Sequence, residues 1–278
     1  MMLQLRKADL HFHSIRDCRY TDEIWNAKGL GVLDEWANDV VIYCREIGLN
    51  FIAVTDHNDY WASLALKEAI QKANAVDEIW LLGGMEITSS DGIQVIIYFD
   101  LDYYDTTEKL SGLCGVLGVV DMPQKDISEK KQSRPTTMNL DVIIDQFSKR
   151  RDKDYVLICP VVEGKSGIVG GHRNGKNIYV KEEIVGGVVS QNINRVSGQV
   201  IDGKDVEYGE KPIGVLVTSD ARKLKSDNRG NANSVGSAVT WLKISEPKCK
   251  ALRQALYLEG IKGYSILNQT NRITISRN

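Results

Sequence analysis

The spacing of apolar side chains predicts a series of short strands. Residues 3–7 alternate apolar and polar side chains, which is the pattern of a strand with one buried face. Residues 51–55, 155–159 and 213–218 are continuous apolar runs, typical of strands that are covered on both faces. The remaining strands are expected at 79–86, 93–99 and 238–242.

Helical periodicity separates these strands. Between residues 34 and 47 the apolar side chains recur on one helical face, and Gly48 follows where a C-terminal cap belongs. A second helix is expected around Leu66. A third follows Asn139 as its N-cap residue, and a fourth is opened by Pro247. Strands that alternate with helices indicate an α/β protein with a mainly parallel sheet, open or closed.

Four stretches lack a regular pattern. Residues 14–31 are expected to be irregular, and 121–137 to form a polar surface loop. Residues 164–175 form a glycine-rich loop, and 179–208 show no pattern that assigns them. These stretches interrupt the alternation of strands and helices without marking a boundary between domains.

Length and composition are those of an ordinary globular protein. The chain has 278 residues, of which 42% are hydrophobic and 26% charged. We expect one domain over residues 1–278, with the segment 263–278 closing or leaving it. A formal net charge of −2 does not indicate a general polyanion binder, although a local basic cleft is compatible with it.

The cellular location is predicted from the absence of membrane-spanning and signal-peptide patterns. No run approaches the roughly 18 apolar residues that span a bilayer. The first residues have no apolar core of signal-peptide type. The five cysteines are odd in number and widely spaced, which indicates reduced thiols. We therefore expect a cytoplasmic protein that does not interact with membranes.

Candidate chemistry begins with His11 and His13 at the end of the first predicted strand. Residues two apart in a strand point to the same face, so both imidazoles would project together. Such a pair can supply two ligands to one metal ion. By itself the pair is equally compatible with two strand histidines that have no metal role.

The positions of other polar residues favour the interpretation that His11 and His13 bind a metal ion. Asp56 and His57, Glu86, and Asp220 each lie at or just past the end of a predicted strand. In a barrel of parallel strands, that rim delivers residues from every strand to a common site. Histidines and carboxylates from several strands would then converge as metal ligands.

These residues, in this order, resemble the motifs of the PHP (polymerase and histidinol phosphatase) family. The matching segments are residues 9–14, 55–57, 84–86 and 219–221. The resemblance implies a distorted (βα)7 TIM-like barrel that binds up to three Mn, Zn or Fe ions and hydrolyses phosphate esters. Segments 240–243 and 252–256 look most like PHP domains associated with AAA/SMC-like ATPases, the TrlF-like proteins.

The resemblance also implies roles for single residues. It assigns a first metal to His11, His13, Glu86 and Asp220, and a further position to His57. Two other ligand positions of the family correspond here to Gln94 and Val161, and a third corresponds to Arg222. We therefore expect about one divalent transition metal ion, with a second, weaker position. The expected site residues are His11, His13, His57, Glu86, Asp220, Arg222, His172, Arg173 and Lys165.

Outside the ligand set, several roles stay open. Arg222 is expected either to bind phosphate oxygens or to pair with Asp56 or Glu86 in an inactive site. His172 is either a ligand or general acid, or an exposed loop histidine. Lys165 and Arg173 are phosphate clamps or solvated loop charges. Asp9 and Asp56 are expected to orient the neighbouring imidazoles.

Two functions follow. The first is a metal-dependent phosphoesterase acting on nucleic-acid phosphodiesters, with an ATPase partner in cis or in trans. The basic segments 149–151 and 222–225 are compatible with phosphate contacts. The alternative is a catalytically degenerate PHP module that binds nucleic acid or a protein partner. Metal analysis of the purified protein separates the two.

Overall fold

The protein is a mixed α/β structure. The computed structural model describes residues 3–119, 134–170, 172–191, 193–225 and 233–262. The strands of this part are β1 (Gln4–Phe12), β2 (Phe51–Val54), β3 (Trp80–Leu81), β4 (Gly83–Thr88), β5 (Gln94–Phe99), β6 (Val156–Pro160), β7 (Gly186–Ser190), β8 (Gly214–Thr218) and β9 (Thr240–Ile244).

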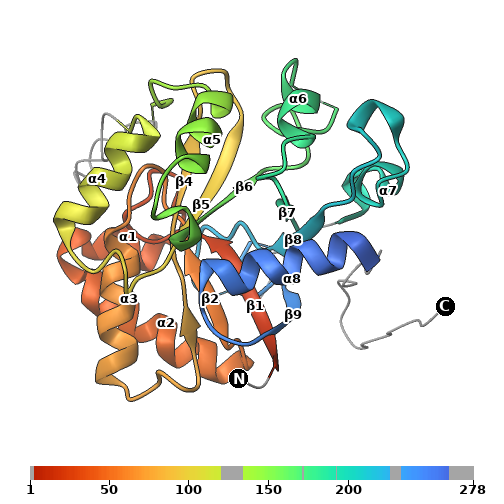
Figure 1. The fold of residues 1–278 in the computed structure, drawn as a ribbon. Coiled ribbons are helices and arrows are strands. Elements are labelled where there is room, and N and C mark those ends of the chain that lie inside the picture. Colours follow the sequence, from red (N-terminus) through yellow and green to blue (C-terminus); the bar gives the residue numbers. More distant parts are fainter. Residues whose placement is uncertain (1–2, 120–133, 171, 192, 226–232, 263–278) are drawn as a thin grey trace.

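Helices of different lengths surround these strands. The α-helices are α1 (Glu23–Lys28), α2 (Leu33–Ile47), α3 (Trp61–Lys72), α4 (Thr107–Leu117), α5 (Leu140–Ser148), α6 (Gly175–Tyr179), α7 (Gly198–Ile201) and α8 (Cys249–Lys262). Helices α2 and α3 pack against each other beside the first sheet, and α8 runs along β8 and β9 (Figure 1). Short 3-10 turns lie at Leu30–Val32, Lys153–Tyr155, Ile193–Arg195 and Val206–Tyr208.

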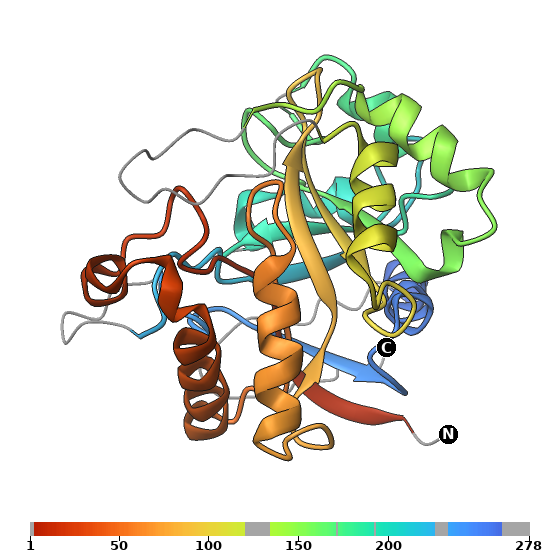
Figure 2. The same ribbon diagram turned by 90° about the vertical axis from the view of Figure 1, so that its left-hand side faces the viewer.

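The described strands form three sheets, and no closed barrel is found among them. The first has the order β3-β2-β1-β9, the second β4-β5-β6, and the third β7-β8. Parallel pairing joins β1 to β2, β2 to β3, and β7 to β8. The pairs β1–β9, β4–β5 and β5–β6 are antiparallel. The prediction of a mainly parallel sheet is therefore wrong, because the short turn after β4 returns the chain as a hairpin (Figure 2).

Single backbone bridges connect the ends of these sheets. Phe12 bridges to Ala221 and so joins the end of β1 to the segment after β8. His57 bridges to Glu86, joining the end of β2 to β4, and Val161 bridges to Val188. These bridges place residues from distant parts of the sequence beside one another at the sheet ends.

The burial of β1 differs from the predicted alternation. Leu3 and Leu5 are 55% and 49% exposed, whereas Arg6 is 8% exposed. The Arg6 guanidinium lies over the Trp80 ring, 3.8 Å from its centroid, and donates to the carbonyl of Glu78. A cation stacked on an aromatic ring can occupy an inner position, so the face predicted to be buried is the outer one.

Local signals located several elements correctly. Gly48 caps α2 in the left-handed conformation with φ 65°, where its backbone N–H reaches the carbonyls of Arg45 and Cys44. Asn139 caps α5 by accepting a hydrogen bond from the backbone of Val142. In both cases the residue type satisfies backbone groups that the helix end leaves free.

Other elements were not predicted. The six-residue helix α1 lies within the stretch expected to be irregular, and its N-cap Asp22 accepts from the N–H groups of Ile24 and Trp25. Helix α4 and strand β7 were also missed. A helix of six residues carries too few apolar positions to show a period. Gly112 and Gly115 weaken the helical signal of α4, and Gly186 and Gly187 weaken the strand signal of β7.

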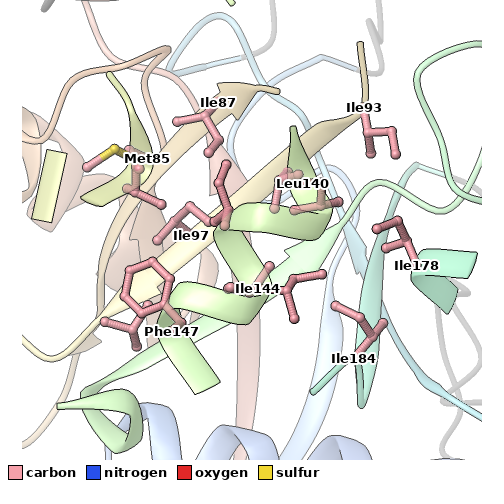
Figure 3. Close-up of a cluster of buried hydrophobic side chains, with 14 of the residues drawn as sticks. Met85, Ile87, Ile93, Ile97, Leu140, Ile144, Phe147, Ile178 and Ile184 are labelled. Atoms are coloured by element: carbon pink, nitrogen blue, oxygen red, sulfur yellow. The ribbon is translucent and has the colours of Figure 1, made fainter. Parts of the chain in front are cut away.

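The largest apolar cluster lies between the second sheet and its helices. Figure 3 shows Met85, Ile87 and Ile97 of the β4–β5 hairpin facing Leu140, Ile144 and Phe147 of α5, with Ile178 and Ile184 beyond. Helix α4 covers the same face (Figure 2). This packing fixes the hairpin, and with it the position of Glu86.

Two of the predicted segments fall mainly outside the described residues. These are most of 121–137 and all of 263–278. The described end of the first, from residue 134, is attached to the fold. The backbone N–H of Thr136 donates to Thr88, and that of Thr137 donates to Gly118. None of the helices in the described ranges is long and apolar enough to cross a membrane.

The five cysteines all lie in the described part of the chain, and none forms a disulfide. Four of them are buried, and burial raises the pKa of Cys44 as well as that of Cys159, the latter to about 12. Four of the five therefore lie in the core as small apolar side chains, whereas Cys18 is partly exposed.

Candidate metal centre

Strand β1 and the residue after it supply two imidazoles. His11 is 3% exposed and His13 is completely buried. Their ring centroids are 5.2 Å apart at an interplanar angle of 74°. The two side chains thus lie on one side of the strand end, as the spacing of two residues predicts.

Asp220 and Glu86 face these imidazoles. His11 Nε2 lies 3.6 Å from Asp220 Oδ1 and 3.8 Å from Glu86 Oε2. His13 Nε2 lies 3.2 Å and 3.6 Å from the same two oxygens. We call His11, His13, His57, Glu86 and Asp220 the histidine–carboxylate cluster.

The backbone around Asp220 is held in an uncommon conformation. Asp220 has a φ of 47°, in the left-handed region that Asp and Asn adopt more readily than most residues. Its N–H donates to the carbonyl of His11, and the N–H of His13 donates to Ala221. The turn after β8 is therefore attached to both histidine positions of β1.

A close approach between β2 and β4 positions Glu86. A Cβ at Gly84 would lie 2.6 Å from Thr55 Cγ2 and 2.8 Å from the carbonyl oxygen of Val54. Only glycine permits this approach. The backbone N–H of Glu86 then donates to the carbonyl of Asp56. Glu86 was predicted at the end of its strand, but it lies within β4.

His57 reaches the cluster from the segment after β2. Its ring stacks on His13 with centroids 5.1 Å apart and an interplanar angle of 15°. His57 Nε2 lies 3.4 Å from Glu86 Oε2 but has no hydrogen-bond partner among the described residues. A buried nitrogen without a hydrogen bond, facing a carboxylate, is the arrangement that a cation would complete.

The donor set fits a divalent transition metal. A tetrahedral ion with bonds of about 2.0–2.2 Å separates its ligand atoms by about 3.3–3.6 Å. The five histidine–carboxylate distances of the cluster, 3.2–3.8 Å, are close to this separation. Imidazole with carboxylate suits Zn, Mn or Fe. His11, His13 and Asp220 form one group of ligand atoms within 4.8 Å of one another, and His13, His57 and Glu86 form a second.

The two histidines of β1 differ electrostatically. Burial lowers the pKa of His11, whose Nδ1 forms a 2.6 Å hydrogen bond with the neutral hydroxyl of Thr55. Burial also disfavours the charged form of His13, but the carboxylates of Asp17 and Asp220 outweigh it and raise the pKa of His13 well above its ordinary value. The difference comes from the group that contacts Nδ1.

The carboxylates divide into two classes. Burial would raise the pKa of Asp220, but its hydrogen bond with His13 and the charge of His11 hold that pKa below its usual range. Burial raises the pKa of Asp56 to about 7 and that of Asp9 to about 6. Asp220 is therefore ionised and available as a ligand at neutral pH.

Among the described residues, neither Asp9 nor Asp56 forms a side-chain hydrogen bond to an imidazole of the cluster, although Asp56 Oδ1 lies 4.0 Å from His13 Nδ1. Asp9 accepts hydrogen bonds from the backbone and hydroxyl of Ser219 and from the N–H of Gly236. Asp56 accepts from the backbone and hydroxyl of Ser14. Both carboxylates instead connect the strand ends that carry the cluster.

The contacts that support the cluster residues were not predicted, although Gln94 was named as the counterpart of a family ligand. Thr55 bonds to His11 as described above, and Gln94 donates a 2.7 Å hydrogen bond to Glu86 Oε1. Asp17 Oδ2 lies 2.7 Å from His57 Nδ1 and 3.1 Å from His13 Nδ1. The only sequence signal for Asp17 was its position four residues after His13.

Arg222 lies beside the cluster. Its Nη2 is 3.8 Å from Asp220 Oδ2, and its side chain is 35% exposed. The expected alternative pairing with Asp56 or Glu86 is not found among the described ion pairs. The guanidinium thus combines contact with a cluster residue and access to solvent.

The structure does not bring the other three predicted residues to the cluster. His172 Nε2 bonds to the carbonyl of Asp91, and its Nδ1 accepts from the N–H of Asn174. Lys165 and Arg173 are exposed. Within the described ranges, no hydrogen bond or ion pair connects either cation to the cluster.

Comparisons with known proteins give matches among solved structures alone. No protein-family model matches the chain, and no curated protein matches it. Among solved structures, one from Bifidobacterium adolescentis, described as a "putative metal-dependent phosphoesterase", is 13% identical with a TM-score of 0.49. That match covers 89% of this chain and 94% of the other. At this level the likeness carries no argument about fold or activity.

Proposed function

We propose that this protein is a metal-dependent phosphoesterase. The observation that carries the proposal is the convergence of two imidazoles and two carboxylates, with separations of 3.2–3.8 Å between them. His11, His13, Glu86 and Asp220 would hold about one Mn, Zn or Fe ion. His57 would add a second, weaker position.

A bound divalent ion supplies Lewis acidity and a water of lowered pKa, which are the requirements of phosphate-ester hydrolysis. The chain's own residues supply the rest. Arg222 would bind phosphoryl oxygens through its solvent-accessible guanidinium, and so stabilise the charge that develops on them. His57 would hold a second cation through Nε2, beside Glu86, and so contribute to stabilising the developing charge.

His172, Lys165 and Arg173 remain predictions with weaker support. Both ring nitrogens of His172 contact backbone groups, and this leaves neither free for proton transfer. We therefore assign the catalytic work to the cluster and Arg222.

For the substrate we propose a nucleic-acid phosphodiester, with an AAA/SMC-like ATPase acting in cis or in trans. The support is the resemblance to TrlF-like PHP domains, together with the basic segment 222–225 that follows Asp220. The segment 149–151 supports it less, since Arg150 pairs with Asp152 at 2.6 Å. On the same resemblance we propose that the fold is a distorted form of the (βα)7 barrel.

One observation favours a second candidate, the degenerate binding module. The amide of Gln94 bonds to Glu86 Oε1, and Val161, which has no ligating atom, fills a strand-pairing position. Both stand where the family resemblance implies ligands. A protein that has lost these positions could retain the fold and one ion without turnover.

Metal analysis combined with hydrolysis assays tests the proposal. The purified chain should contain about one transition metal ion and hydrolyse a model phosphodiester or single-stranded DNA when supplied with Mn²⁺ or Zn²⁺. Bound metal without hydrolysis of any phosphate ester would favour the degenerate module. Absence of metal binding at micromolar Zn²⁺ would refute both the centre and the activity.

A further inference from the structure

Asp17 is the buried carboxylate through which two histidines of the cluster are connected. Its side chain is inaccessible to solvent. The backbone N–H of Asp17 donates to Ser14, its carbonyl accepts from Tyr20, and its Oδ1 accepts from the N–H of Arg19 at 2.7 Å. The tight turn after β1 thus fixes this carboxylate independently of the histidines.

The second oxygen of Asp17 holds His57 at two points. Oδ2 accepts from the backbone N–H of His57 at 2.8 Å and from its ring Nδ1 at 2.7 Å. An ionised carboxylate only accepts hydrogen bonds, so the proton lies on Nδ1 of His57. The opposite nitrogen, Nε2, then faces Glu86.

The same oxygen also contacts His13. Asp17 Oδ2 lies 3.1 Å from His13 Nδ1, although the ring N–H is not aligned for a hydrogen bond. The two rings are stacked at 15°, and the Nδ1 atoms of both contact this one carboxylate. Both Nε2 atoms face Glu86, and that of His13 also lies 3.2 Å from Asp220 Oδ1. His11 differs, since its Nδ1 bonds to Thr55.

We propose that Asp17 is a positioning residue: its Oδ2 holds the Nδ1 edges of both His13 and His57, so that the pair presents its two Nε2 atoms to the metal centre beside Glu86. This inference rests on the proposed metal centre, but not on its catalytic activity. It makes the His13–His57 pair a single chelating unit governed by one carboxylate that does not itself bind the ion.

The expected effect is large for a residue outside the ligand set. Partners that fix the orientation of a ligating histidine typically contribute 10–100-fold to metal affinity. Asp17 serves two histidines, so the Asp17→Asn variant should lose about 100-fold in zinc affinity. Asparagine preserves the shape and one acceptor but removes the charge that holds both N–H groups.

Long-range proton–nitrogen NMR of the imidazoles tests the inference directly in the metal-free protein. The chain has four histidines, so the spectrum is simple, and His57→Gln assists its assignment. His172 is an internal reference, since its Nδ1 accepts a hydrogen bond and its proton must lie on Nε2. Protonated Nδ1 atoms on both His13 and His57 are expected. An unprotonated Nδ1 on either would overturn the inference.

Titration with Zn²⁺ alone supplies the second readout. Asp152→Asn is the matched control, because Asp152 is also buried and bonds to Tyr104 and Arg150 away from the cluster. Zinc affinity should fall in Asp17→Asn and stay at the wild-type value in the control. A folded Asp17→Asn protein with wild-type zinc affinity would overturn the inference, and if this variant fails to fold, the wild-type NMR spectrum decides.

The two proposals fail in different ways. If zinc binds and Asp17→Asn weakens it while no phosphate ester is hydrolysed, the role of Asp17 stands and the phosphoesterase proposal falls. If hydrolysis depends on the metal but the wild-type spectrum shows an unprotonated Nδ1 on His57, the phosphoesterase proposal stands and the role of Asp17 falls.

Discussion

The histidine–carboxylate cluster and the 164–175 loop carried similar candidate residues, but the structure treats them differently. Each cluster residue lies in a strand or within three residues of its end and faces another member. Backbone bridges join His57 to Glu86, and Phe12 to Ala221 beside the other three. In the loop, Lys165 and Arg173 point to solvent, and His172 bonds to backbone groups. A titratable residue becomes a candidate ligand through the partners that face it, and residue type alone does not decide this.

The sharpest way to test this comparison is to remove a ligand from the cluster. Asp220→Asn should reduce zinc affinity by more than about 100-fold and bring hydrolysis to background, because a direct ligand contributes more than a group behind it. Asparagine tolerates the left-handed backbone of this position, so the fold should persist. Zinc titration and a phosphodiesterase assay measure the effects.

The matched control is the exposed Asp154→Asn, which should leave both quantities unchanged. Equal activity of wild type and Asp220→Asn would show that any hydrolysis comes from another site.

A second comparison uses one arginine from each region. Arg222→Ala should leave zinc affinity unchanged, because arginine is not a ligand, but lower turnover by about 10²–10³ through loss of charge stabilisation. Arg173→Ala, in the loop, should have no effect on either. Rates at saturating Zn²⁺ distinguish the two. An equal loss in both variants would place the loop in the active site after all.

Arg222→His extends this test. It introduces the imidazole that the family resemblance implies at this position, close to Asp220. We expect the zinc content per chain to rise above that of the wild type. Metal content by elemental analysis measures it, and an unchanged content would indicate that the site does not accommodate a further ion there.

The loop histidine should affect stability and not metal binding. His172→Ala removes the hydrogen bond to Asp91 and should lower the free energy of unfolding by about 1 kcal/mol. Urea denaturation measures this change. Zinc affinity should be that of the wild type, and a large decrease in it would make His172 a ligand.

The smallest expected effect is the pH dependence of stability that arises from Lys211. Histidines in the cluster face carboxylates, whereas Lys211, close to α6, donates to the carbonyls of Tyr179 and Lys181. Burial lowers the pKa of Lys211 to about 8. Between that value and its ordinary pKa of 10.5, the unfolded chain binds more protons than the folded one. The free energy of unfolding should therefore rise with pH, with a slope that corresponds to less than ~1 proton. Lys211→Met should remove this slope in urea denaturation at pH 8 to 10.

The sequence determined the parts of the fold that depend on neighbouring residues. The apolar runs located β2, β6 and β8, Gly48 and Asn139 marked helix ends, and the spacing of His11 and His13 placed two imidazoles on one side of β1. These features follow from backbone geometry, which acts over a few residues.

Only the tertiary structure decided which groups meet. Asp17 contacts His57 across 40 positions, a contact that nothing in the sequence indicated. The contact of His13 with Asp220 across 207 positions was expected from the family resemblance, and not from local pattern. It also decided that β4–β5–β6 is antiparallel and that Arg6 lies inward on Trp80. The physical reason is that the protonation, orientation and burial of a polar side chain depend on the partners that desolvate it, and packing brings those partners from distant parts of the chain.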